Sequence, residues 1–245
     1  MSLKRVNILG TRFHCLTRTE AVDRIADYLQ SRNKASVFTP NPEIVIEACN
    51  NPEFEQILNK SELLLADGIG VIVGAKIIGH PLPERVAGYD TLLDLFSKIE
   101  QTDLKVFFLG SGPGVAAEAR EKILDRNPNL NIVGVHDGYF KDDDQVIDYI
   151  NGFEPDLLLV GLGAPKQEYW IHKNRERLTA SVLYGCGGSL DGFSGRVPRS
   201  PDIFIKLNLE WFHRLISQPT RAKRMLRLPL FLVKIIISGR KYSQE

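Results

Sequence analysis

One aspartate follows a buried strand at a place where a carboxylate could act on a substrate. Asp67 comes directly after the predicted strand 62–66, whose last four residues are apolar, and before a glycine-flanked helix start. Ligands of open parallel sheets bind at the carboxyl ends of the strands, so we expect this side chain to project from that edge. A carboxylate placed there is suited to general-base catalysis. A role as the N-cap of the following helix stays open.

A second acidic cluster has a different interpretation. Asp142, Asp143 and Asp144 stand just before a helical pattern, which favours a solvated helix start over a metal site. The sequence lacks an isolated Asp-x-Asp after an apolar strand, and it has no histidine cluster; either would offer metal ligands. We therefore predict no metal and no other cofactor.

A glycine-rich turn lies between an apolar strand and a helical pattern. Gly110, Gly112 and Gly114 let the backbone approach a ligand closely, and the helix that follows favours phosphate at its N-terminus. A full dinucleotide fingerprint would place its third glycine at position 115, which is Val115. Binding of a nucleotide or phosphate and a simple tight turn both stay open.

Three more strand exits carry polar or glycine-rich loops. Thr39 and Asn41 stand in a Thr-Pro-Asn-Pro loop whose prolines fix the backbone, so the loop could hold sugar hydroxyls or simply start a helix. Lys166 and Gln167 follow a Gly-Ala-Pro turn and should point near the same edge, and the segment 185–191 is a third such exit. Several exits of this kind at one edge favour a binding site.

These exits belong to a series of buried strands that alternate with helices. Strands rich in Val, Leu and Phe without polar alternation are buried on both faces, and intervening helices imply parallel crossovers. We predict a doubly wound, Rossmann-like α/β body over residues 1–195. The strands are expected at residues 36–39, 62–66, 104–109, 131–136, 156–161 and 181–184, and helices at 42–50, 69–78, 113–126 and 166–178.

The C-terminal fifty residues differ from this body in charge. Residues 196–245 hold 11 Lys or Arg against 3 acidic residues, while the first 195 hold 20 against 27. Basic and apolar side chains together are typical of a helix that lies on an anionic membrane. The longest apolar stretch of the tail is too short to span a bilayer. Packing on the body or on a sister subunit is the alternative, and Pro219 and Pro229 should divide the tail into three short helices.

Several stretches together resemble the WecG/TagA/CpsF glycosyltransferase family, in order and over nearly the whole chain. They are TPNPEIV, ADGIGVIVGAK with ERVAGYD, FFLGSGPGV, PDLLLVGLGAPKQE, GCGGSLDGFSGRVPRSP, EWFHRL and PTRAKRM. The resemblance implies transfer of N-acetylmannosamine from a UDP donor to undecaprenyl-diphosphate-linked N-acetylglucosamine. It further implies inversion at the anomeric carbon, a β-1,4 linkage and no required metal. The reaction would take place on the inner face of the membrane, in wall teichoic acid synthesis.

The resemblance also assigns roles to residues of this chain. Asp67 matches the general base, Arg85 an arginine beside the diphosphate, and Gln167 a polar active-site position. Thr39 and Asn41 match a loop that positions a substrate. Asp191 and Tyr139 match contacts to the nucleoside, and the tail arginines implicated in the family are Arg214, Arg221 and Arg224.

Other functions stay open beside this one. The same fold could use the uronic acid or another UDP-sugar for a different surface polymer, and a nucleotide-dependent oxidoreductase or a non-catalytic membrane adaptor are further alternatives. Expected partners are the UDP-sugar, the polyprenyl-diphosphate acceptor and an anionic membrane surface, with no nucleic acid. Away from membranes the apolar tail favours self-association into a dimer or trimer.

Overall fold

The computed structural model of the protein describes residues 3–207, 209–217 and 227–242. Eight strands form a two-stranded and a six-stranded sheet in this part of the chain. The strands are β1 (Arg5–Ile8), β2 (Thr11–His14), β3 (Ala35–Phe38), β4 (Leu63–Leu64), β5 (Val106–Gly110), β6 (Ile132–His136), β7 (Leu157–Gly161) and β8 (Val182–Gly185). The helices of the body are α1 (Arg18–Ser31), α2 (Pro42–Asn50), α3 (Pro52–Asn59), α4 (Ile69–Ile77), α5 (Gly88–Ile99), α6 (Val115–Leu124), α7 (Asp143–Asn151), α8 (Lys166–Asn174) and α9 (Ser189–Phe193).

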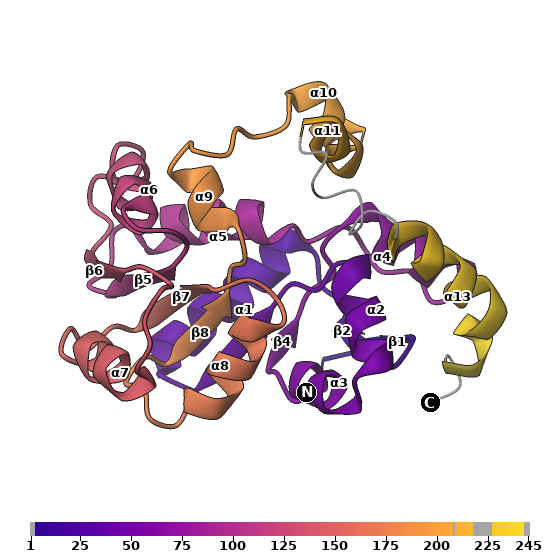
Figure 1. Cartoon of the computed structure of the whole chain (residues 1–245), viewed down its shortest axis with the longest axis horizontal. Helices are drawn as coiled ribbons and strands as arrows, with labels where there is room; N and C mark the ends of the chain where they lie inside the picture. Colours follow the sequence, from indigo (N-terminus) through magenta and orange to yellow (C-terminus); the bar gives the residue numbers. More distant parts are fainter. Residues whose placement is uncertain (1–2, 208, 218–226, 243–245) are drawn as a thin grey trace.

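The large sheet confirms the predicted doubly wound fold. Its strand order is β4-β3-β8-β7-β5-β6 and every pair is parallel. The residues of β3, β5, β7 and β8 are buried throughout, as expected for strands covered on both faces. Helices α1, α5, α6 and α9 pack on one face, and α2, α3, α7 and α8 on the other (Figure 1).

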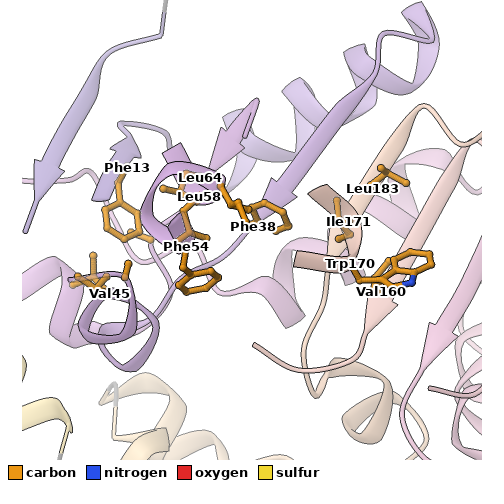
Figure 2. Packing of buried hydrophobic residues seen from close by; sticks show 14 of the residues in the cluster. Phe13, Phe38, Val45, Phe54, Leu58, Leu64, Val160, Trp170, Ile171 and Leu183 are labelled. Atoms are coloured by element: carbon orange, nitrogen blue, oxygen red, sulfur yellow. The ribbon is translucent and has the colours of Figure 1, made fainter. Parts of the chain in front are cut away.

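Two hydrophobic clusters, one on each face, hold the helices against the sheet. One of them joins Phe38 of β3 with Phe54 of α3 and Trp170 of α8, all of which are buried. Figure 2 shows these side chains together with others from β2, β7 and β8. Burial of large apolar side chains on both faces fixes the sheet rigidly, so that the loops at its edge are held in place.

Several helix starts have the capping residue that their sequence provides. Thr17 and Glu20 form a reciprocal capping box at α1. Asn41 caps α2 and Asn51 caps α3 through side-chain oxygens that accept from backbone N–H groups. Asp142 caps α7 in the same way, accepting from Asp144 N at 2.8 Å. The prediction that this acidic run is a helix start is therefore confirmed.

The N-terminal hairpin β1–β2 was not predicted. Its strands pair antiparallel, from Arg5 opposite His14 to Ile8 opposite Thr11. The turn consists of Leu9 with φ 53° and Gly10 with φ 92°, and leucine rarely adopts such a conformation. Because the usual Asn-Gly or Asp-Gly signal is missing, the local sequence gives little indication of the turn.

The tail contains helices α10 (Asp202–Lys206), α11 (Glu210–Ser217) and α13 (Arg227–Tyr242). The prediction that Pro229 breaks the tail is wrong, because Pro229 lies in the first turn of α13, where a proline costs no helical hydrogen bond. Pro219 lies outside the described residues. Among the described helices, none combines the length and the apolar character that crossing a bilayer requires.

Helix α13 packs on the body with one face and exposes apolar residues on the other. Phe231 and Ile235 are fully buried against α2 and α4 (Figure 1). A Cβ on Gly74 of α4 would lie 2.9 Å from the Phe231 ring, so the glycine permits this close packing. On its exposed side lie Leu230, Val233, Ile236 and Ile237. The predicted packing of the tail on the body is therefore confirmed for one face of α13. The opposite face is apolar, and no other part of the described chain covers it.

Candidate active site at the carboxyl edge of the sheet

The strand order brings the predicted polar loops together along one edge. The residues that follow β4, β3, β8, β7, β5 and β6 succeed one another there. Adjacent strands are about 4.8 Å apart, so the distance from β5 to β3 is roughly 14 Å across three intervals. An extended nucleotide-sugar can therefore contact loops from several strands at once.

Asp67 lies at this edge, half-buried, three residues after the end of β4. Its backbone N–H donates to Pro40 O at 3.1 Å, which ties it to the loop after β3. Its Oδ2 accepts from Gly88 N, the first residue of α5, at 3.4 Å. The N-cap of α4 is Gly68, so the alternative role of Asp67 as cap of that helix is wrong. The predicted position of Asp67 at this edge is confirmed.

Thr39 stands beside Asp67 at the end of the neighbouring strand. A Cβ on Gly88 would lie 2.8 Å from Thr39 Oγ1, so Gly88 is the common neighbour of the hydroxyl and the Asp67 carboxylate. Asn41 in the same loop uses its Oδ1 to accept from Ile44 N at 3.1 Å. The helix-entry role of Asn41 is therefore confirmed, and its Nδ2 is the group that can donate to a ligand.

Arg85 approaches the edge from the loop between α4 and α5, and it pairs with the tail. Its Nη2 lies 2.7 Å from Oε2 of Glu210, the first residue of α11, and the two side chains are only 13% and 20% exposed. Arg85 also lines a cavity of about 400 Å³ together with Arg18, Ile69 and Ile205. Ile205 belongs to α10. The tail thus forms part of the wall beside Arg85.

Gln167 is buried at the start of α8 and fixes the loop after β8. Its Oε1 accepts from Gly187 N at 2.9 Å, and its Nε2 donates to Glu168 Oε1 at 2.8 Å. Glu168 is 1% exposed, and burial raises the pKa of its carboxyl to about 7. The two hydrogen bonds set the orientation of the Gln167 amide. Positions 163 and 187 leave open space where a Cβ would point, as a site for a ligand requires.

The glycine turn after β5 is held by two neighbouring strand exits. Gly110 has φ 133°, and a Cβ there would lie 2.5 Å from the carbonyl carbon of Gly161, so only glycine fits. Ser111, with φ 57°, donates from its Oγ to Asp191 Oδ2 at 3.0 Å. Gly112 has nothing nearer than 3.8 Å to a built Cβ. Asp191 and the glycine turn therefore do lie together.

Gly114 is the N-cap of α6, with φ 81°. The helix N-terminus next to it is covered by Arg196, which donates from Nε and Nη2 to both carboxylate oxygens of Glu118 at 2.7 and 2.6 Å. Bidentate pairs of this kind fix the arginine firmly. The first residue of the predicted tail is thus fastened to the body beside the glycine turn.

Lys166 and Tyr139 are exposed at the surface. Tyr139 is 76% exposed, and its backbone N–H donates to Asp137 Oδ1 at 2.8 Å. The exposed Lys166 places its Nζ 5.7 Å from the centre of the Phe140 ring. Lys166 and Gln167 start the same helix, but Lys166 faces the β6–α7 loop while Gln167 faces the loop after β8.

The tail arginines can be placed only in part. Arg214 belongs to α11, and Arg221 and Arg224 lie outside the described residues. Over residues 3–207, 209–217 and 227–242, no three His, Cys, Asp or Glu side chains stand close enough to hold a metal ion.

Sequence patterns missed three residues that shape this edge. They are Ser111, Glu168 and Glu210, which contact Asp191, Gln167 and Arg85 in turn. Ser111 stands between two glycines, a context that signals an unusual backbone conformation. Glu168 gave no signal because its burial, at 1% exposure, depends on tertiary packing. Glu210 gave none because its partner Arg85 is distant in the sequence.

Comparison with known proteins decides which family of enzymes has this arrangement. The model of the glycosyl transferase WecG/TagA/CpsF family matches residues 6–245 of the chain. The chain belongs to this family. It is a glycosyltransferase, as its resemblance implied.

Curated relatives agree with the family match. A Bacillus spizizenii protein is 43% identical over 209 residues, which are 85% of this chain and 81% of the relative. A Bacillus subtilis protein is 37% identical over 209 residues, covering 85% and 82%. A Staphylococcus aureus protein is 34% identical over 243 residues, covering 98% and 95%. All three relatives are named N-acetylglucosaminyldiphosphoundecaprenol N-acetyl-beta-D-mannosaminyltransferase.

Proposed function

We propose that this enzyme transfers N-acetylmannosamine from UDP-N-acetylmannosamine to undecaprenyl-diphosphate-linked N-acetylglucosamine. The names of its relatives support the transferred sugar and the acceptor. The observation that carries the proposal is that Asp67 after β4 and Thr39 after β3 both lie against Gly88 at the start of α5. They form a polar group at an edge where α/β folds bind ligands. The product would be a β-1,4-linked disaccharide on the lipid diphosphate, in wall teichoic acid linkage-unit synthesis.

In the proposed mechanism Asp67 removes the proton from the acceptor C4 hydroxyl while that oxygen attacks the anomeric carbon of the donor. The bond between this carbon and the diphosphate oxygen breaks, UDP leaves with the electron pair, and the configuration inverts. Thr39 Oγ1 and Asn41 Nδ2 hold the sugar hydroxyls beside the carboxylate. General-base assistance of this kind commonly contributes about 10²–10⁴-fold in rate.

The nucleoside end of the donor would lie at the other side of the edge. Asp191 stands over the glycine turn 110–114, where Gly112 leaves room for close backbone approach. Tyr139, highly exposed near the end of β6, offers a ring to the nucleoside, and Lys166 offers a cation nearby. Gln167 supports the loop between the two ends by holding Gly187.

Departure of UDP places negative charge on the diphosphate, and cationic groups are needed to stabilise it. Arg85 is the proposed cation of the body, and Arg214, Arg221 and Arg224 those of the tail; we propose that no metal ion is required. Residues 196–245 would thus form an appendage that completes the site. The exposed apolar face of α13 and the basic excess of the tail support docking on the inner face of the membrane.

A donor panel tests the proposal. The enzyme is mixed with a short-chain prenyl-diphosphate-GlcNAc acceptor and with UDP-ManNAc, UDP-ManNAcA, UDP-GlcNAc or UDP-GlcNAcA, and the glycan product is analysed by mass spectrometry. We expect disaccharide only from UDP-ManNAc. A product from UDP-ManNAcA instead would favour the alternative donor and a different surface polymer.

A further inference from the structure

The contact between Arg85 and Glu210 is the most shielded of the described ion pairs that join the tail to the body. Its side chains are 13% and 20% exposed. The other pairs of this kind are Arg199–Asp90 at 41% and 16%, Arg196–Glu118 at 47% and 42%, and Arg227–Glu47 at 38% and 34%. A shielded pair interacts more strongly than an exposed one, and of these four pairs Arg85–Glu210 is the one that involves a residue of α11.

The charged residues that line the cavity beside Arg85 balance one another, and Glu210 adds one further negative charge. Two arginines, Arg18 and Arg85, line the cavity together with Glu84 and Asp90. Arg18 is itself paired with Asp94 at 2.8 Å. A phosphate group that approached Arg85 would therefore meet the Glu210 carboxylate at close range, and like charges at that distance repel each other.

We propose that Glu210 is an internal stand-in for a substrate phosphate. Before a substrate binds, its carboxylate pairs with the Arg85 guanidinium. When a diphosphate binds, one of its phosphates replaces the carboxylate in this pair. The inference rests on the proposed function, because that function brings two diphosphates to this edge, one on the nucleotide donor and one on the lipid acceptor. Both contain phosphate groups, which an arginine can bind through two parallel hydrogen bonds.

The exchange also changes the state of the tail. Glu210 is the first residue of α11, so loss of its ion pair releases the end of that helix nearest the body. The same helix carries the exposed apolar residues Phe212 and Ile216 and also Arg214. Arrival of a diphosphate at Arg85 would thereby free α11 to rearrange over the substrate.

Isothermal titration calorimetry on the full chain tests the exchange. UDP and a short-chain prenyl-diphosphate-GlcNAc are titrated separately into wild type, Glu210→Gln and the control Glu47→Gln, which removes a different pair between tail and body. We expect Glu210→Gln to bind about three- to tenfold more tightly the ligand whose phosphate takes the Glu210 position, because one nearby like charge is gone. Glu47→Gln should match wild type. Unchanged or weaker binding of both ligands by Glu210→Gln would overturn the inference.

Trp211, next to Glu210, reports the release of α11 directly. The chain has two tryptophans, so Trp170→Phe leaves Trp211 alone. Saturation with the ligand that Glu210→Gln binds more tightly should shift the Trp211 emission. In the Trp170→Phe protein that also carries Glu210→Gln, the emission should be shifted before any ligand is added. An emission that stays constant on saturation contradicts the exchange. If wild type releases no UDP from UDP-ManNAc with acceptor, the proposed function fails; if it does and binding is not tightened by Glu210→Gln, only this inference fails.

Discussion

Asp67 and Gln167 contribute to the same edge in different ways. Asp67 is half-buried at the carboxyl edge of the sheet, where its Oδ2 accepts from Gly88 N at the start of α5. Gln167 is 4% exposed, and its amide group forms hydrogen bonds with Gly187 and Glu168. We therefore propose a catalytic role for Asp67 and a positioning role for Gln167.

Replacing the proposed base tests the first assignment. Asp67→Asn keeps the size of the side chain but removes its capacity to take a proton. We expect turnover to fall about 10²–10⁴-fold while the affinity for UDP changes little, measured by UDP release and by calorimetry. Asp23→Asn, a change of the same kind in an exposed ion pair with Lys98, serves as the control and should retain full turnover. Turnover within threefold of wild type in Asp67→Asn would remove this residue from the mechanism.

Glu168 should make the stability of the body depend on pH. Its pKa is raised to about 7 by burial, so the folded protein holds a proton there that the unfolded chain releases above its ordinary, lower pKa. This contribution to stability is complete at acid pH and is lost as pH rises to about 7. A shift of this size corresponds to about 3 kcal/mol.

The matched variant isolates this effect from that of other groups. His14 acts with the opposite sign, because burial and Arg5 lower its pKa to about 4, so its contribution is lost as pH falls from the ordinary histidine range. Urea unfolding at pH 5 and pH 8 should therefore be compared between wild type and Glu168→Gln. We expect wild type to lose more stability than the variant between these values. An equal loss in both proteins would show that Glu168 ionises normally.

Among the elements, the glycine turn contains two glycines that serve different purposes. A side chain at Gly110 would collide with the backbone of β7, whereas one at Gly112 would meet no neighbour closer than 3.8 Å. We expect Gly110→Ala to destabilise the protein by about 2 kcal/mol or more, because of the collision and the positive φ. Gly112→Ala should keep the melting temperature and weaken UDP binding. If Gly112→Ala leaves the UDP affinity unchanged, the nucleotide does not approach this turn.

The parallel strands and their exits were predictable from sequence because each is an apolar run followed by glycine, proline or a polar residue. Even so, the predicted strand 62–66 is reduced to Leu63–Leu64, since β4 lies at the edge of the sheet and pairs with β3 alone. The position of Asp67 was predictable for the same reason. The contacts of Arg85 were not, because its partner Glu210 lies more than a hundred residues away.

At the scale of the whole molecule, the tail is both packed and exposed. Its excess of basic residues predicted a membrane surface, while the burial of Phe231 and Ile235 shows that α13 is part of the folded body. Packing on the body therefore holds for one face of this helix, while membrane binding stays a prediction for its exposed face. Composition could not separate these faces, because apolar residues occur on both.

The exposed face of α13 should bind anionic membranes. Ile236 and Ile237 are 69% and 78% exposed, so replacing both with Glu should leave the fold intact. We expect the affinity for phosphatidylglycerol-rich vesicles, measured by flotation, to fall about tenfold or more, since buried apolar area is lost and negative charge is added. The control Gln30→Glu adds charge on α1, on the opposite face of the sheet. Equal binding by the double variant would exclude this face as the docking surface.

One transfer measurement on wild-type enzyme tests the proposed reaction most directly. UDP release and product formation are followed with UDP-ManNAc and prenyl-diphosphate-GlcNAc in anionic vesicles, and the linkage in the product is determined by NMR. We predict one UDP per disaccharide and a β-1,4 bond. UDP release without disaccharide, or a retained α-configuration, would contradict this prediction.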